Sequence, residues 1–357
     1  MSLAVTGATL DGQRITLRAV DGKIAELGTE VEPHAGDERL AADGLALVPG
    51  LVNGHTHAAM TLFRGYGDDL PLMEWLETRI WPVEARLTAE DVYWGTRLAC
   101  VEMIRSGTVR FWDMYWQPSA VARAVEDAGI RATVGAPLVD GLDPDRSEEL
   151  RASARQGIDA LAAVGPRVTA SLAPHAIYTV SEGSLRWIAE EAEARELPVH
   201  IHVSETREEV ERCVAVHGVR PAAYLDRLGL LGHHSLLAHG VWFDAEELAL
   251  VGERGATVVT NPVSNLKLAV GGVFRYDAAR ACGVPVGLGT DGPGSNNSLD
   301  LLQDVKVFAL LQKHAAGDPA AVPAAEAWAV ATGARAPLLG QTGRLAVGEP
   351  ADFVLVR

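Results

Sequence analysis

The 357-residue chain has few cysteines and a marked deficit of basic side chains. Its 31 lysines and arginines stand against 47 aspartates and glutamates, which gives a formal net charge of −16. Nucleic-acid binding needs clustered lysine and arginine, so this balance argues against a nucleic-acid partner. No apolar run approaches the roughly 18 residues of a membrane-spanning helix, and the first residues lack a basic-then-apolar secretory pattern. We therefore expect a protein with neither a nucleic-acid nor a membrane partner.

The three cysteines, Cys100, Cys213 and Cys282, lie far apart and form no C-x-x-C pair. An odd, unpaired set is typical of buried thiols in a reducing compartment rather than of a disulfide framework or a thiolate metal site. With 48% apolar and 22% charged residues, the composition is that of a globular protein. We expect a cytoplasmic protein.

Both ends of the chain have the pattern of short β-strands. Near the N-terminus, Asp11-Gly12 and Asp21-Gly22 separate three short apolar segments, as in tight hairpins. The C-terminal stretch 343–357 returns to this style and ends in a strand at 352–356. One small β-sandwich-like domain built from both termini is predicted, over residues 1–48 and 340–357.

Between these ends, short apolar runs alternate with helical patterns such as 181–195 and 323–331. Eight runs are candidate strands: 50–53, 108–113, 131–135, 168–172, 198–203, 235–238, 257–261 and 286–290. Eight strands alternating with helices favour an α/β fold of the (β/α)₈ TIM-barrel type over residues 49–339. No glycine-rich fingerprint follows the first strand, which weakens the alternative of a dinucleotide-binding sheet.

A long insertion follows the first barrel strand, at about residues 58–87. It contains Gly65-Tyr66-Gly67-Asp68-Asp69 and the aromatic residues Trp75 and Trp81, and it ends where Thr88 to Asp91 has the spacing of a helix capping box. Such a loop at the carboxyl end of a barrel strand is a candidate substrate lid. The simpler alternative is a loop that only packs on the barrel.

Histidine and carboxylate residues stand at the ends of several predicted strands. His55 and His57 follow the first strand; their spacing of two places both rings on one side of an extended segment. His202 with nearby Glu205, His239 and Asp291 end three later strands. Because strand ends converge at one mouth of a barrel, these groups can meet and bind Zn²⁺ or a similar divalent ion in an open catalytic site. The alternative is a set of unrelated buried polar residues.

The segments PGLVNGHTH, HIHVSE, LLAHG, NPVSN and LGTDGPGSNNSLD resemble the amidohydrolase superfamily. They are most similar to its mononuclear-metal aminohydrolases, which include 5′-methylthioadenosine/S-adenosylhomocysteine deaminases. The fourth strand leads to Ala173-Pro174-His175 and lacks the lysine that bridges two metals in binuclear relatives. The resemblance therefore implies one divalent ion, Zn²⁺ in the first instance, with Fe²⁺ and Mn²⁺ as alternatives.

The resemblance implies His55, His57, His202 and Asp291 as metal ligands. It makes Glu205 the general acid and base, His239 an outer residue that polarises the attacking water, and Asp291 the acceptor of a water proton. The reaction implied is hydrolytic deamination, in which an amidine carbon loses ammonia and becomes a carbonyl.

Four further residues are implied as substrate contacts. Trp75 and Glu84 lie in the long insertion, and Glu84 is expected to accept hydrogen bonds from two vicinal ribose hydroxyls. His175 ends the fourth strand, and Ser295 is placed to contact the purine edge. Without the resemblance, Glu84 would equally suit an exposed charge before the Thr88 cap.

The chain departs from relatives that accept S-adenosylhomocysteine, which carry arginines near the end of the third strand. Residues 134–140 here contain no arginine, although Arg146 or Arg151 could substitute. We expect a neutral nucleoside substrate such as 5′-methylthioadenosine, 5′-deoxyadenosine or adenosine. A deaminase of 6-aminodeoxyfutalosine is the main alternative, followed by guanine and triazine aminohydrolases and by a catalytically silent scaffold of the same fold.

Two expectations concern the whole molecule. Barrels of this kind often dimerise, so the formation of a homo-oligomer is one expectation for this chain. The resembling family generally continues beyond the ADFVLV strand, so we expect a reduced terminal sheet or a truncated chain.

Overall fold

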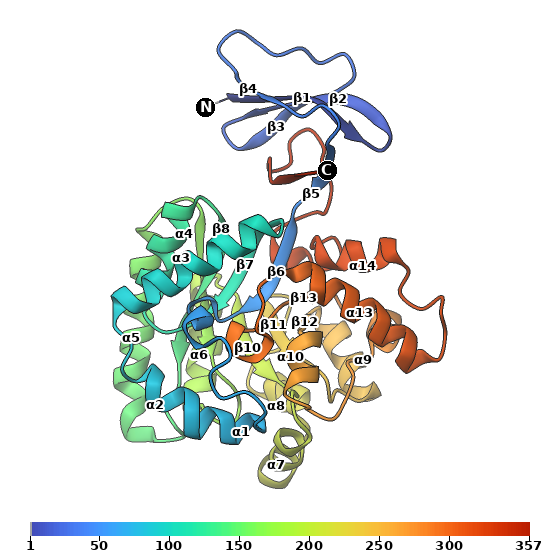
Figure 1. Cartoon of the computed structure of the whole chain (residues 1–357). Helices are drawn as coiled ribbons and strands as arrows, with labels where there is room; N and C mark the ends of the chain where they lie inside the picture. The colour runs from blue at the N-terminus through green and yellow to red at the C-terminus, as the bar shows by residue number, and fades with distance from the viewer. Residues whose placement is uncertain (1) are drawn as a thin grey trace.

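Eight parallel strands form the central sheet of the computed structural model, which describes residues 2–357 (Figure 1). They pair in sequence order, as expected for strands joined by helical crossovers. The strands are β6 (Leu51–Thr56), β7 (Thr108–Met114), β8 (Arg131–Leu138), β9 (Val168–Pro174), β10 (Val199–Val203), β11 (Ser235–His239), β12 (Thr257–Thr260) and β13 (Val286–Leu288). Each coincides with one of the eight runs predicted from the sequence. The predicted α/β barrel architecture is confirmed.

The sheet closes on itself where the segment after β13 meets β6. The Asp291 amide donates to the His55 carbonyl at 3.0 Å, and Asn53 bonds Thr290 through both its side-chain oxygen and nitrogen. Gly289 lies in this seam, where a Cβ atom would stand 2.8 Å from the His55 carbonyl oxygen. Closure therefore places two candidate metal ligands, His55 and Asp291, side by side.

Helices cover the outside of the barrel and connect its strands (Figure 1). The larger ones are α3 (Ala89–Arg105), α4 (Pro118–Ala128), α5 (Pro144–Ala162), α6 (Glu182–Arg195), α7 (Arg207–His217), α8 (Pro221–Arg227), α9 (Ala245–Arg254), α13 (Leu301–Ala316) and α14 (Ala324–Ala331). The shorter ones are α10 (Pro262–Lys267), α11 (Tyr276–Ala281), α12 (Pro293–Asn296) and the 3₁₀ turn η3 (Pro337–Leu339). The predicted capping box at the start of α3 is present, with Thr88 and Asp91 exchanging hydrogen bonds.

The insertion after β6 folds into four short helical segments rather than an irregular loop. These are the 3₁₀ turn η1 (Ala58–Phe63), α1 (Leu72–Trp75), the π-helical turn η2 (Leu76–Ile80) and α2 (Trp81–Glu84). Their apolar side chains, among them Trp75 and Ile80, belong to a buried cluster shared with α3 and α4. The insertion therefore packs on the barrel and also reaches over its mouth, as the lining of the site cavity shows below.

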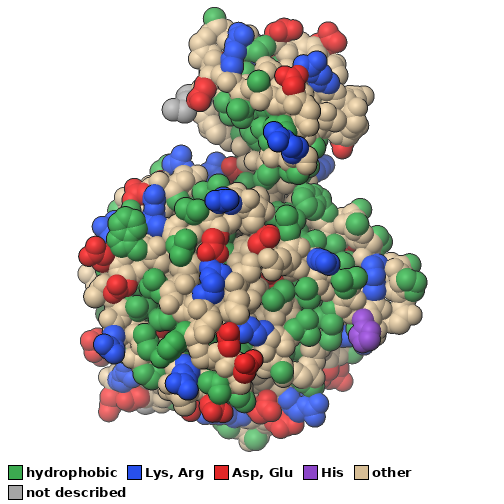
Figure 2. Space-filling view, in the orientation of Figure 1, with side chains coloured by type: hydrophobic (Ala, Val, Ile, Leu, Met, Phe, Trp, Pro, Cys, Tyr) green, Lys and Arg blue, Asp and Glu red, His purple; other side chains and the backbone are tan. Residues whose placement is uncertain are grey.

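Both chain ends contribute to a second, six-stranded sheet that stands apart from the barrel (Figures 1 and 2). Its strands are β1 (Ser2–Leu10), β2 (Gln13–Val20), β3 (Lys23–Gly28), β4 (Glu38–Ala41), β5 (Ala46–Pro49) and β14 (Phe353–Val356). The two Asp-Gly hairpin turns occur as predicted, with positive φ at both residues. Strands β4 and β5 were not predicted. Of these, β5 pairs with β14 and continues through Gly50 into β6, which links the two sheets.

The distribution of charged side chains on the surface agrees with the acidic composition of the chain. On the face in Figure 2, lysines and arginines lie among aspartates and glutamates rather than in a basic patch. Among residues 2–357, no helix is both long and apolar enough to cross a membrane. The three cysteines are free thiols; Cys100 and Cys213 are buried, and Cys282 is partly exposed.

The seam between β13 and β6 gives the first testable prediction. Gly289→Ala forces a methyl group against the backbone of His55, and overpacking of this kind lowers the free energy of unfolding by about 1–3 kcal/mol. The matched control is Gly157→Ala in α5, where the new methyl meets its neighbours at an ordinary 3.5 Å. That control should be neutral or stabilising by up to about 1 kcal/mol, since alanine favours helix. The measurement is the thermal unfolding midpoint of each variant. Equal midpoints for both variants would contradict the close packing of Gly289 against His55.

Candidate active site

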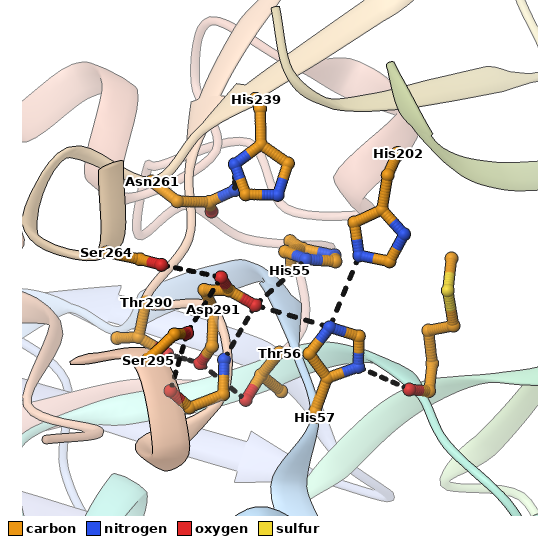
Figure 3. Close-up of polar contacts among 12 residues, drawn as sticks. His55, Thr56, His57, His202, His239, Asn261, Ser264, Thr290, Asp291 and Ser295 are labelled. Carbon is orange, nitrogen blue, oxygen red and sulfur yellow. Dashed lines mark hydrogen bonds and ion pairs between the residues drawn. The ribbon is translucent and has the colours of Figure 1, made fainter. Parts of the chain in front are cut away.

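The predicted metal ligands meet at the carboxyl ends of the barrel strands (Figure 3). His55 lies in the last two residues of β6, and His57 follows the strand as the N-cap of η1. His202 lies on β10, and Asp291 follows β13. Ligands from the first, fifth and eighth strands thus reach one point because the sheet curls into a barrel.

The ligand atoms of these residues are close together. The Asp291 Oδ1 atom lies 3.3 Å from His55 Nε2 and 3.2 Å from His57 Nε2. The Nε2 atoms of His57 and His202 are 3.2 Å apart. Groups that could hold a metal are His55–His57–Asp291 and His55–His202–His239, in each of which all ligand atoms lie within 4.8 Å of one another. The four predicted ligands, three histidines and one carboxylate, form a donor set that suits Zn²⁺ and other first-row divalent ions.

The outer ring nitrogens of the three histidines are already bonded, which leaves each Nε2 facing the centre. His57 Nδ1 donates to the Met114 carbonyl at 2.5 Å, and His202 Nδ1 donates to the His175 carbonyl at 2.8 Å. His55 Nδ1 contacts the Nε2 atom of the buried His200 at 2.7 Å. The His55 Nε2 atom is buried and makes no hydrogen bond of regular geometry, with Asp291 Oδ1 at 3.3 Å beside it. A buried acceptor of this kind fits a metal ligand whose tautomer is fixed from outside.

Asp291 carries the main negative charge of the cluster. Its Oδ2 accepts hydrogen bonds from Ser264 Oγ at 2.6 Å and Ser295 Oγ at 2.9 Å. Burial alone would raise the pKa of Asp291, but hydrogen bonds and charge from His55 and His57 hold it well below its usual range. In turn, burial opposes a charge on His57, yet Asp291 outweighs burial and raises its pKa to about 9. The centre therefore attracts positive charge, which a divalent cation supplies while leaving the imidazoles neutral for ligation.

Glu205 and His239 flank this cluster. The Glu205 Oε1 atom lies 3.8 Å from His239 Nδ1, and both residues are buried. His239 Nδ1 also contacts the Asn265 side-chain oxygen at 2.8 Å. Burial is the main cause that raises the pKa of Glu205, which keeps its carboxyl protonated closer to neutral pH. A carboxyl group with a raised pKa is suited to donate a proton.

A cavity of about 540 Å³ opens above the cluster. All four predicted substrate contacts line it: Trp75, Glu84, His175 and Ser295. The Trp116 indole N–H approaches Glu84 Oε2 at 3.4 Å, and burial is the largest cause that raises the pKa of Glu84. Glu84 is therefore a partly buried residue of the cavity wall, and its contact with ribose stays a prediction.

The cavity lining is mostly apolar, and its charged groups are all acids or histidines. The acids are Glu84, Glu205 and Asp291; among the described residues, no lysine or arginine lines it. Arg146 is exposed, and Arg151 points to Ser184 at 3.2 Å. Neither of the two arginines considered from the sequence therefore lines the cavity.

Several residues of the site were missed by sequence reasoning. Ser264 and Asn265, which hold Asp291 and His239, belong to the NPVSN segment whose individual roles were not assigned. Tyr115, Trp116 and Tyr178 line the cavity. Tyr115 and Trp116 directly follow β7, so a search of every strand end for aromatic residues would have found these two.

Comparison with known proteins agrees with this geometry. Residues 46–357 match the model of the amidohydrolase family. A 5′-deoxyadenosine deaminase of Methanoregula boonei is 48% identical over 339 residues, covering 93% of this chain and 76% of the relative. A 5-methylthioadenosine/S-adenosylhomocysteine deaminase of Archaeoglobus fulgidus is 43% identical, covering 95% and 80%.

Among solved structures, a zinc-bound adenosine deaminase from Xanthomonas campestris superimposes with a TM-score of 0.90 at 36% identity. The match covers 99% of this chain and 84% of that one. The family model spans most of the present chain, and the relatives are similar along nearly all of it. The chain belongs to the amidohydrolase family.

Proposed function

We propose that the protein is a metal-dependent hydrolytic deaminase of adenine nucleosides with an uncharged 5′ group, such as 5′-deoxyadenosine, 5′-methylthioadenosine or adenosine. The observation that carries this proposal is the His₃-Asp cluster beside Glu205 at the floor of an apolar cavity without basic residues. The names of the relatives, 5′-deoxyadenosine deaminase among them, support the substrate class.

The proposed metal ligands are His55, His57, His202 and Asp291, with Zn²⁺ as the proposed ion and Fe²⁺ or Mn²⁺ compatible with the same donors. The zinc in the adenosine deaminase structure supports that choice. The buried Nε2 of His55, which makes no regular hydrogen bond, and the low pKa of Asp291 support the binding of a metal ion by these residues. A divalent ion bound here lowers the pKa of water toward about 7.

In the proposed reaction the protein moves protons between water, the purine ring and ammonia. Asp291 accepts a proton from the attacking water, while His239 orients that water by a hydrogen bond. Glu205 donates a proton to the ring nitrogen next to the attacked carbon, which makes that carbon more electrophilic. The C–N bond then breaks as the carboxylates deliver a proton to the departing amine. The amidine becomes a carbonyl, and ammonia leaves.

The remaining cavity residues are proposed to hold the nucleoside. Glu84 accepts hydrogen bonds from the ribose hydroxyls, and the ring of Trp75 offers an apolar wall because its N–H is already donated to the Tyr66 carbonyl at 3.3 Å. His175 lies beside His202, with ring centroids 4.8 Å apart, and borders the substrate. Ser295 bonds Asp291 and lines the cavity, which suits a contact with the purine edge.

The role of Glu205 is tested by Glu205→Gln. This variant keeps the shape of the side chain but cannot donate the catalytic proton in the same way, so kcat for 5′-deoxyadenosine should fall by about 10²–10⁴-fold. Metal content should remain that of the wild type, because Glu205 is not a proposed ligand. Loss of the adenine absorbance band and release of ammonia measure turnover. A wild-type rate in a metal-loaded variant removes Glu205 from this role.

A substrate panel tests the nucleoside and its 5′ group. The uncharged nucleosides should exceed S-adenosylhomocysteine and 6-aminodeoxyfutalosine in kcat/KM by about tenfold or more, because no cation lines the cavity to pair with a charged substituent. Guanine and triazines should not be turned over. If guanine is deaminated while every adenosine derivative is inert, the substrate class is wrong.

Glu84→Gln tests the ribose contact. Replacing one acceptor oxygen by a donor should lower kcat/KM for 5′-deoxyadenosine by about tenfold, the effect of one hydrogen bond to a charged group. The same variant should act on 2′,3′-dideoxyadenosine nearly as well as the wild type, since that substrate lacks both hydroxyls. An equal loss on both substrates would show that Glu84 acts elsewhere.

A further inference from the structure

The turn that carries Glu205 between β10 and α7 has an unusual backbone. Ser204, fully buried, has a φ of 51°, in the left-handed region that non-glycine residues seldom adopt. Such a conformation persists only where neighbouring groups hold it. The neighbours of this turn therefore decide where the Glu205 carboxyl group points.

The side chain of Glu209 supplies two of those contacts. Its Oε1 accepts a hydrogen bond from the Ser204 amide and its Oε2 accepts one from the Glu205 amide, each at 2.9 Å. Glu209 is itself fixed at the start of α7, where its own amide donates to Thr206 Oγ1 at 3.2 Å. On the other side, the Ser204 carbonyl accepts from the Trp242 amide at 2.9 Å. The turn is clamped from both sides.

The position of Glu209 is energetically costly for an acid. The residue is 6% exposed, and burial raises its pKa to about 8 although the two amide donors oppose the shift. Within residues 2–357 it forms no ion pair, so no cation offsets the burial. A neutral side chain would be easier to bury, but only a carboxyl group offers two acceptor oxygens to two successive amides.

We propose that Glu209 is a positioning residue, whose clamp on the Ser204 and Glu205 amides holds the Glu205 carboxyl group against His239 in the geometry needed for proton transfer. The inference rests on the role proposed above for Glu205. Glu209 does not line the cavity, so it has no contact with substrate and acts on the reaction through the turn and Glu205.

The first experiment compares Glu209→Gln with two controls. Glutamine fills the same space but turns one acceptor into a donor facing an amide N–H, so the clamp opens. Because a displacement of about 1 Å can lower a rate about 10²-fold, we expect kcat for 5′-deoxyadenosine to fall by about that factor. The KM and the metal affinity, measured by chelator competition, should stay within about twofold, since neither depends on the clamp.

The controls separate positioning from charge and from stability. Glu208→Gln makes the same substitution at the neighbouring, exposed residue of α7 and should leave kcat unchanged. Glu326→Gln removes a buried carboxylate that bonds Tyr276 and Arg335 far from the site, so it should lower the unfolding midpoint without lowering kcat. Should Glu209→Gln not fold, Glu209→Asp replaces it; the shorter side chain cannot reach both amides.

The deciding measurement is the Glu205→Gln/Glu209→Gln double variant. If Glu209 acts through Glu205, the second substitution should cause no further loss of kcat once Glu205 has been replaced. A multiplicative loss in the double variant overturns the proposal, as does a wild-type kcat in Glu209→Gln. Failure of the proposed function gives a different result, because the wild type would then not turn over 5′-deoxyadenosine, whereas failure of the role of Glu205 would leave Glu205→Gln fully active.

Discussion

The buried charge of Asp291 is the interaction on which the rest of the site depends. Its carboxylate is 5% exposed and accepts hydrogen bonds from two serines, Ser264 and Ser295, in addition to its contacts with His55 and His57. An ionised group in such a place is stable only with charged or hydrogen-bonding neighbours on every side. Barrel closure, α10 and α12 all supply them. Several elements of the fold thus surround this one carboxylate. Its negative charge makes the site a centre that binds cations.

Two carboxyl groups then differ in acidity within one cavity. Burial opposes ionisation of Asp291, but His55 and His57 hold its pKa well below the usual range, whereas burial raises the pKa of Glu205. One group is therefore suited to bind a cation and accept a proton, and the other to donate one. Environments that separate the acidities of neighbouring acids in this way assign them different roles. The division proposed for the reaction thus has a physical basis in the surroundings of each group.

The sequence predicts the strands and the ligands for a common reason. Buried parallel strands leave continuous apolar runs, and a histidine or aspartate at the end of such a run stands out. The spacing of His55 and His57 adds the two-residue period of an extended chain. By contrast, β4 is a short exposed segment with little apolar pattern, and β5 is a four-residue apolar run that only Gly50 separates from the first barrel strand. Their pairing with β1 and β14 depends on the assembled sheet.

Sequence patterns also do not predict contacts that are made through backbone groups. The Met114 carbonyl fixes the His57 ring, and the amides of Ser204 and Glu205 receive Glu209, but any residue type has a carbonyl and nearly all have an amide. Glu209 looks in the sequence like one more acid of a helix rich in charge. Only the fold shows that it points inward to the turn, while its neighbour Glu208 faces solvent.

The net charge of the chain is less informative about the substrate than the charged groups that line the cavity. A net charge of −16 alone says little about a ligand, because it is spread over the surface with both signs interspersed. The cavity lining has a local balance of its own: three acids, four histidines and an apolar wall, with no lysine or arginine among the described lining residues. A divalent cation bound at the floor would offset the acids there, whereas among the described residues no lysine or arginine lines the cavity to offset an anionic substituent. This lining supports the proposed preference for a nucleoside with an uncharged group at the 5′ carbon.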